Sequence, residues 1–262
     1  MYNLTENMNN NLINLDDLEN NPTPRVPVCL CLDTSGSMGR IVRGEIQNTG
    51  RTVFKDGQNW NIVTGGVSAI EDLNEGINEF FDAIRSDEVA AYSAEVCVIT
   101  FGGNKAEIIS PFATVDQLDT SFSLKAEGRT YMGEAVNMAL DCLENRKEAY
   151  KKKGIDYFQP WLVIMTDGAP NGSPSELETA ISRTQEMVND RKLTVFPLGV
   201  GPDADMSTLA KFSPKRSPLK VRETKYKEFF EWLSQSVTTT SQSMPGEKQK
   251  LDVEGIQGWG EL

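Results

Sequence analysis

Histidine is absent from this chain of 262 residues. Histidine is the side chain that most often acts as a general base near neutral pH, and it is the base in Ser-His and Cys-His nucleophile pairs. Its absence excludes those forms of catalysis, and it excludes any zinc site that needs an imidazole ligand. Catalysis would have to use other groups, of which a lysine base is conceivable.

Cysteine is scarce. The four cysteines are Cys29, Cys31, Cys97 and Cys142, and they form no C-x-x-C pair. Cys29 and Cys31 are two residues apart in an expected strand, so both should point to one face of a sheet. This pattern favours buried, reduced thiols that fill a core over a disulfide or zinc framework.

The sequence also lacks a basic-then-apolar signal segment at its N-terminus and any apolar run approaching the ~20 residues that a membrane helix needs. We therefore expect a cytoplasmic protein without a membrane attachment.

Basic residues are outnumbered by acidic ones. The chain has 26 Lys and Arg against 38 Asp and Glu, a formal net charge of −12. Because a nucleic-acid backbone needs a basic surface, we expect no nucleic-acid partner. An acidic protein can still hold an acidic protein partner if a cation lies between the two.

The most informative stretch begins at residue 28. Residues 28–32 are an apolar run, typical of a fully buried central strand, and Asp33, Ser35 and Ser37 follow directly. In an open parallel sheet, ligands bind at the carboxyl ends of the strands. Hard oxygen donors at such an end suit a hard divalent cation such as Mg²⁺.

Three ordered segments then carry a family resemblance. The chain resembles von Willebrand factor A (VWA) domains that have a metal-ion-dependent adhesion site (MIDAS). The resemblance is carried by the D-x-S-x-S pattern at residues 33–37, by Gly128-Arg129-Thr130, and by residues 163–168, in which Asp167 follows an expected strand. The resemblance covers about residues 25–240. Residues 74–76 and 199–202 look closest to bacterial cytoplasmic, tellurite-resistance-associated (TerY-like) VWA proteins.

The resemblance implies a metal site and a function. Ser35, Ser37 and Thr130 would coordinate Mg²⁺ or Mn²⁺, while Asp33 and Asp167 would act directly or, largely, through water. The metal would then take a further oxygen from an Asp or Glu of a protein partner. This describes a non-catalytic protein-interaction module, in a bacterial stress-response or tellurite-resistance-type complex.

Simpler interpretations stay open. Ser35 and Ser37 could be ordinary turn residues, and Thr130 could be a helix N-cap. The cation of Arg129 could weaken metal binding or steer an acidic ligand. A metal-assisted phosphohydrolase of the haloacid-dehalogenase type would need a second Asp where Ser35 stands. A scaffold with a purely structural metal is the other alternative.

Strand-like and helix-like segments alternate along the chain, and the resemblance agrees with the pattern. Together they predict an α/β fold: a doubly wound, Rossmann-like, mostly parallel six-stranded sheet with one antiparallel edge strand and helices on both faces. Expected strands are 26–32, 94–101, 106–109 (the antiparallel edge), 161–165, 193–198 and 219–221. Expected helices are 68–86, 115–122, 132–152, 174–191, 205–212 and 226–237.

Segments outside this alternation define the domain limits. Asp56-Gly57 between β-prone runs predicts a hairpin inserted at 40–66, after the first strand. Residues 1–24 should be a flexible lead-in, although the apolar pattern at 12–18 leaves a short docking helix open. The VWA domain would be 25–243, and 244–262 would be a C-terminal tail.

Overall fold

The computed structural model describes residues 18, 20–55, 57–221 and 225–246. Its main sheet has six strands in the order β10-β9-β8-β1-β6-β7. Every neighbouring pair is parallel except β6 and β7, which are antiparallel, so the predicted sheet is confirmed. The strands are β1 (Val26–Thr34), β6 (Ala94–Gly102), β7 (Lys105–Thr114), β8 (Trp161–Thr166), β9 (Thr194–Val200) and β10 (Leu219–Val221).

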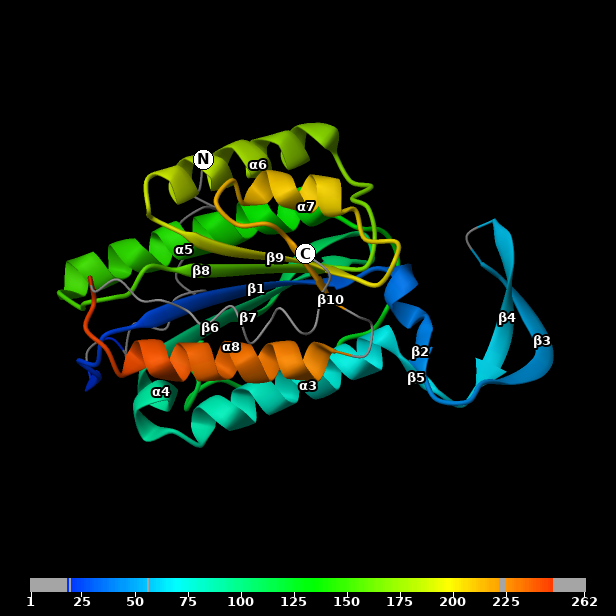
Figure 1. Cartoon of the computed structure of the whole chain (residues 1–262), viewed down its shortest axis with the longest axis horizontal. Coiled ribbons are helices and arrows are strands. Elements are labelled where there is room, and N and C mark those ends of the chain that lie inside the picture. Colours follow the sequence, from blue (N-terminus) through cyan, green and yellow to red (C-terminus); the bar gives the residue numbers. More distant parts are fainter. Residues whose placement is uncertain (1–17, 19, 56, 222–224, 247–262) are drawn as a thin grey trace, which may run out of the picture.

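Helices cover both faces of this sheet (Figure 1). On one face α3 packs on α8, with the short α4 beside them, and on the other face α5 packs on α6, with α7 next to α6. No helix in the described residues is long and apolar enough to cross a membrane. The helices are α3 (Ala69–Arg85), α4 (Glu88–Ser93), α5 (Met132–Lys153), α6 (Pro174–Asn189), α7 (Met206–Phe212) and α8 (Tyr226–Ser241).

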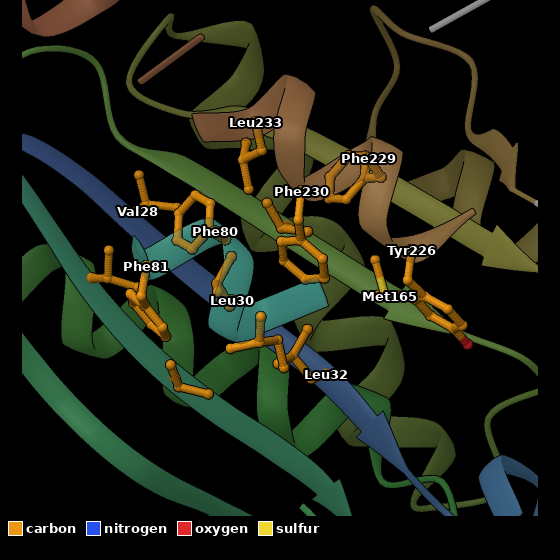
Figure 2. Close-up of a cluster of buried hydrophobic side chains, with 14 of the residues drawn as sticks. Val28, Leu30, Leu32, Phe80, Phe81, Met165, Tyr226, Phe229, Phe230 and Leu233 are labelled. Atoms are coloured by element: carbon orange, nitrogen blue, oxygen red, sulfur yellow. The ribbon is translucent and has the colours of Figure 1, made fainter. Parts of the chain in front are cut away.

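The central strand β1 is buried along its whole length and supplies side chains to both cores. Val28, Leu30 and Leu32 point toward the aromatic side chains of α3 and α8 (Figure 2). Cys29 and Cys31 point the other way, into the core under α5. All four cysteines are free thiols in the structure, as the sequence predicted.

Helix α3 begins where its sequence signal placed it. The Ser68 amide donates to the Glu71 carboxylate at 2.7 Å, and the Glu71 amide donates back to the Ser68 hydroxyl, which completes a capping box. The cap fixes the start of the helix that follows the insertion.

One predicted helix is wrong. Residues 115–117 form a turn, and the chain then runs without regular structure to the loop at 127–129. The side chain of Asn74 in α3 accepts from the Leu124 amide at 2.8 Å and donates to the Leu124 carbonyl at 3.0 Å. Within the predicted span, Arg85 of α3 donates to the carbonyls of Val115 and Leu118 at 3.3 and 3.0 Å, so these backbone groups have side-chain partners in place of helical ones.

Two further differences concern short elements. The edge strand β7 continues through Pro111 to Thr114, beyond the predicted end at 109, because an edge strand tolerates a missing N–H group. Helix α4 was not predicted; it spans only Glu88–Ser93 and is capped by the Asp87 side chain.

The predicted hairpin is present. Strands β3 (Gln47–Lys55) and β4 (Gln58–Thr64) pair antiparallel, and at their base β2 (Ile41–Arg43) pairs with β5 (Val67–Ser68), a pair that was not predicted. Gly44 and Gly66 both have positive φ and lie so close that a Cβ on Gly44 would be 2.9 Å from the Gly66 Cα. Figure 1 shows the β3–β4 ribbon projecting away from the sheet.

The segment at 12–18, for which a docking helix is the alternative to a flexible lead-in, lies outside the described residues except for Leu18. That side chain is buried against Tyr150 and Ile155. Most of the predicted C-terminal tail, beyond Gly246, lies outside the described residues too.

We expect the domain to fold without the ribbon, because β3 and β4 pair only with each other. Replacing residues 45–64 with a three-residue Gly/Ser linker joins Gly44 to Gly65, which already lie close together. Thermal unfolding of this variant should stay cooperative, with a melting temperature within a few degrees of the full chain. A variant that cannot be recovered in folded form would show that the ribbon holds the fold.

Candidate functional site

The candidate site lies where β1 and β8 end side by side. The two strands are parallel, with Leu32 beside Met165, so Asp33 and Thr166 follow at the same edge of the sheet. The Thr166 hydroxyl donates to Asp33 Oδ2 at 2.5 Å, and both residues are buried. This bond holds the Asp33 carboxylate at the carboxyl end of the sheet, where ligands bind in open α/β sheets.

The loop after β1 folds back over this carboxylate. The Ser35 amide donates to Asp33 Oδ1 at 2.7 Å, and a single 3₁₀ turn follows at Gly36–Gly39. The turn is anchored by Met38, which is buried under the hydroxyl of Tyr226. Both oxygens of Asp33 are thus occupied by donors of the protein.

Two serine hydroxyls connect this loop to the end of β8. The Oγ atoms of Ser35 and Ser37 lie 3.0 Å apart, and Ser37 Oγ donates to Asp167 Oδ1 at 2.7 Å. Ser35 and Asp167 are buried, whereas Ser37 is exposed. The network therefore runs from a buried carboxylate to the surface.

The loop that carries Thr130 is held against the same edge by its backbone. The amide of Gly36 donates to the Gly128 carbonyl at 3.1 Å, and the amide of Glu127 donates to the Thr34 carbonyl at 2.8 Å. Gly128 has φ +69°, and a Cβ there would lie 2.0 Å from the Gly103 carbonyl oxygen. Only glycine fits this position, so Gly128 fixes where Thr130 lies.

Asn171 holds Thr130 from the other side. The Thr130 amide donates to Asn171 Oδ1 at 2.8 Å, and the Asn171 amide donates to the Thr130 carbonyl at 3.1 Å. Helix α5 begins at Met132 with Tyr131 as its N-cap and no capping side-chain bond. The interpretation of Thr130 as a helix cap is therefore not supported, and its buried side chain remains a candidate ligand.

The structure brings four of the five predicted residues into one hydrogen-bonded network and places the fifth, Thr130, beside it through backbone contacts. Sequence reasoning missed Thr166 and Asn171. Thr166 stands directly before Asp167, where its hydroxyl can reach the neighbouring strand end. Asn171 lies in a stretch that was interpreted only as a turn, although its side chain joins the Thr130 loop to the β8 loop.

Burial controls the charge of this site. The pKa of Asp33 is raised to about 7, mainly because burial removes the carboxylate from water and to a smaller extent because of the nearby Asp167 charge. The hydrogen bonds from Ser35 and Thr166 lower the pKa of Asp33, but less than burial raises it. A buried acid with a raised pKa beside a second acid is an arrangement that a bound cation would stabilise.

The donor set suits a hard cation. No group of three or more His, Cys, Asp or Glu that could hold a metal occurs in the described part of the chain, so the further ligands would have to be hydroxyls. With metal–oxygen distances of about 2.1 Å, neighbouring oxygens of an octahedral Mg²⁺ site lie about 3.0 Å apart. The Ser35 and Ser37 hydroxyls have that separation, 3.0 Å.

A doubly wound sheet with carboxylates and hydroxyls at the ends of two adjacent central strands defines an α/β domain with a candidate cation site. Residues 28–232 match the family model of the von Willebrand factor type A domain. The chain belongs to this family. A search of curated proteins finds no match.

Solved structures support the fold. The vWF domain of the type V pili tip protein Mfa5 from Porphyromonas gingivalis is 11% identical with a TM-score of 0.57, and the match covers 87% of this chain and 99% of that one. A von Willebrand factor type A protein from Catenulispora acidiphila is 17% identical with a TM-score of 0.54, over 82% of this chain and 43% of that one.

A third similar structure is proximal thread matrix protein 1 from the mussel byssus with a zinc-occupied MIDAS motif. It is 14% identical with a TM-score of 0.50, over 84% of this chain and 47% of that one. This chain thus spans less than half of the Catenulispora and mussel chains. At these identities the comparisons show the fold alone.

Gly128 should be essential for the site although it supplies no ligand. We expect Gly128→Ala to displace the loop and to weaken divalent-cation binding at least tenfold, measured by calorimetry, because the new Cβ collides with backbone. Gly154→Ala is the matched control, since Gly154 also has positive φ but has nothing within 4 Å of a Cβ. Equal cation affinity in both variants would contradict the role given to Gly128.

The raised pKa of Asp33 makes a prediction for the protein in EDTA. The folded pKa of about 7 lies above the unfolded value of about 3.9, so folding is favoured by protonation of Asp33. This contribution is full below pH 4 and is lost as pH rises through 7, by about 3 kcal/mol between pH 5 and pH 8. Urea unfolding should show this loss in the native chain and lack it in Asp33→Asn. Parallel pH profiles would contradict the assignment.

Proposed function

We propose that this protein is a non-catalytic, metal-dependent protein-interaction module. It would bind Mg²⁺ or Mn²⁺ through Ser35, Ser37 and Thr130, with Asp33 and Asp167 close by, and would capture a carboxylate of a partner protein. The observation that carries the proposal is the network that joins Ser35, Ser37 and Asp167 at 3.0 and 2.7 Å beside a buried Asp33. The family membership supports it, because VWA domains commonly mediate metal-dependent protein interactions.

The hydrogen bonds of the site suit indirect roles for both carboxylates. Ser37 donates its proton to Asp167 and therefore accepts from the Ser35 hydroxyl, which leaves one lone pair of Ser37 Oγ available for a cation. Asp33 already accepts from the Ser35 amide and the Thr166 hydroxyl. Asp167 therefore orients the Ser37 hydroxyl directly, Asp33 positions Ser35 through its amide, and both acids would balance positive charge. A cation held mainly by neutral hydroxyls would be a Lewis acid that attracts a further anionic oxygen ligand.

The composition of the donor set favours Mg²⁺ or Mn²⁺ over zinc for this chain. Zinc is bound mostly by cysteine sulfur and histidine nitrogen, and this site offers oxygen alone. A partner carboxylate would approach a protein of net charge −12, so the cation would have to reverse the repulsion locally. Arg129, which directly precedes Thr130, is exposed and carries a positive charge.

We also propose a cytoplasmic location in a bacterial stress-response or tellurite-resistance-type complex. Support for this setting comes from the sequence resemblance at residues 74–76 and 199–202. Free thiols at all four cysteines fit a reducing compartment. The absence of histidine supports the non-catalytic part of the proposal.

Metal binding is tested by melting experiments with and without a chelator. We expect Mg²⁺ or Mn²⁺ at one hundred times its Kd to add about 2.7 kcal/mol to the free energy of unfolding, because a ligand of the folded state stabilises by mass action. Ser37→Ala and Thr130→Ala should lose most of this gain while remaining folded. Thr179→Ala removes an exposed hydroxyl from α6 and serves as the control. Identical melting of the native chain in Mg²⁺ and EDTA would refute the site.

Partner capture is tested by affinity purification from the native cell in Mg²⁺ and in EDTA. We expect a partner that is retained only with the metal and has one indispensable Asp or Glu. Asp→Asn there should be nearly as damaging as Asp→Ala, because a neutral amide oxygen is the poorer ligand. Turnover of a generic phosphoester in Mg²⁺, abolished by Asp33→Asn, would instead establish a phosphohydrolase. If the metal raises the melting temperature of the protein but the partner binds equally well without it, the cation has a structural role only.

A further inference from the structure

The β3–β4 ribbon has two different faces. In an antiparallel pair, residues opposite each other share a face, as do residues two apart along a strand. Val53 pairs with Trp60 and Arg51 pairs with Ile62, so these four side chains lie on one face. We name Val53, Trp60 and Ile62 the apolar ribbon face. Phe54 lies on the other face, among Thr52, Asn59 and Asn61.

The apolar ribbon face is exposed in the described structure. Val53, Trp60 and Ile62 are 46%, 47% and 39% exposed, and they are adjacent to one another. A two-stranded hairpin is marginally stable in water unless a third strand or a packing surface supports it. The main sheet does not supply that support, because β3 and β4 form a sheet of two strands. An exposed cluster of adjacent apolar side chains is a candidate interaction surface.

The ribbon is rooted beside the candidate metal site. Ser37 is only four residues before Ile41, where the root pair β2–β5 begins. Figure 1 shows the ribbon leaving the same end of the molecule at which β1 and β8 terminate. From Ser37 to Ile41, and then across the β2–β5 pair from Ser68 back to Trp60, the path is at most about 40 Å, the length of about twelve extended residues. One short segment of a partner could therefore reach both places.

The charge of the ribbon segment differs from that of the remaining chain. Residues 40–66 have four basic and two acidic residues, a net formal charge of +2, while the rest of the chain has −14. Arg40 and Arg43 pair with acids of the body, with Asp203 and with Asp72 and Glu75. Arg51 extends the apolar ribbon face as an exposed cation. An acidic segment would meet less repulsion here than over the body.

We propose that the apolar ribbon face is the second half of the partner-binding surface, and that its occupant is an extended acidic segment of a partner protein. One Asp or Glu of that segment would reach the metal, and apolar side chains at alternate positions would pack on Val53, Trp60 and Ile62. Its other acidic residues would lie near Arg51. The inference rests on the proposed function, since the metal-bound carboxylate sets the position of the segment.

The test uses the full chain and a display library of random 12-residue peptides, selected in Mg²⁺. We expect the enriched peptides to combine an Asp or Glu with apolar residues at alternate positions. Affinities for the synthesised peptides are then measured by fluorescence anisotropy. The triple variant Val53→Thr, Trp60→Thr, Ile62→Thr keeps residues that favour strands and should bind at least tenfold more weakly. Phe54→Thr, on the opposite face, is the matched control and should bind within twofold of the native chain.

The outcomes separate this inference from the proposed function. A triple variant with native peptide affinity, still abolished by EDTA, would overturn the ribbon proposal and leave the metal-dependent function intact. Binding that persists in EDTA would refute the proposed function. The triple variant must also keep the native melting shift in Mg²⁺, which shows that its body and metal site are folded. Failure of the native chain to enrich any peptide would overturn the ribbon proposal.

Two other occupants would also overturn it. If sedimentation equilibrium shows a dimer for the native chain and a monomer for the triple variant, the ribbon binds a second copy. If a chain ending at residue 246 binds the selected peptides at least tenfold more tightly, and the triple variant shows no such gain, residues 247–262 occupy the ribbon. We expect the native chain and the triple variant both to be monomers. We expect the chain ending at residue 246 to bind the selected peptides with unchanged affinity.

Discussion

The site depends on one buried carboxylate. Asp33 lies near the end of the fully buried strand β1 and accepts hydrogen bonds from the Ser35 amide and the Thr166 hydroxyl. These two bonds fix the loop after β1 and the end of β8 relative to each other. The opposite end of the sheet has a contrasting arrangement, in which the buried Glu95 pairs with Arg25 and Arg146. Glu95 is neutralised by the protein, whereas Asp33 is held by neutral donors, which suits a bound cation.

The sheet topology explains why three distant segments meet there. From β1 the chain crosses to β6 on one side, and after α5 it returns to β8 on the other side of β1. Such a reversal brings loops from both directions to the carboxyl ends of the central strands, where ligands bind in open α/β sheets. The loops after β1 and β8 begin at this edge, and the loop before α5 is tied to it by Gly128 and Asn171.

Local patterns predicted most of the fold, because buried strands and capped helices leave clear signals. The apolar run at 28–32, the Ser68–Glu71 cap and the Asp-Gly turn each correspond to an observed element. The failures depend on long-range contacts. The helix predicted at 115–122 is absent where Arg85, about thirty residues earlier in the chain, donates to the carbonyls of Val115 and Leu118. Sequence motifs were enough to select the side chains of the candidate site. The hydrogen bonds of Thr166 with Asp33 and of Asn171 with Thr130 could not be predicted, because they depend on how segments distant in the sequence align in space.

The central claim is that the hydroxyls of Ser35, Ser37 and Thr130 converge on one cation. Anomalous diffraction from a crystal soaked in Mn²⁺ tests this most directly, because the signal locates the metal independently of the protein atoms. We expect one strong peak within coordination distance of all three hydroxyl oxygens, with Asp33 and Asp167 joined to it mainly through water. A peak elsewhere, or none at this edge of the sheet, would contradict it.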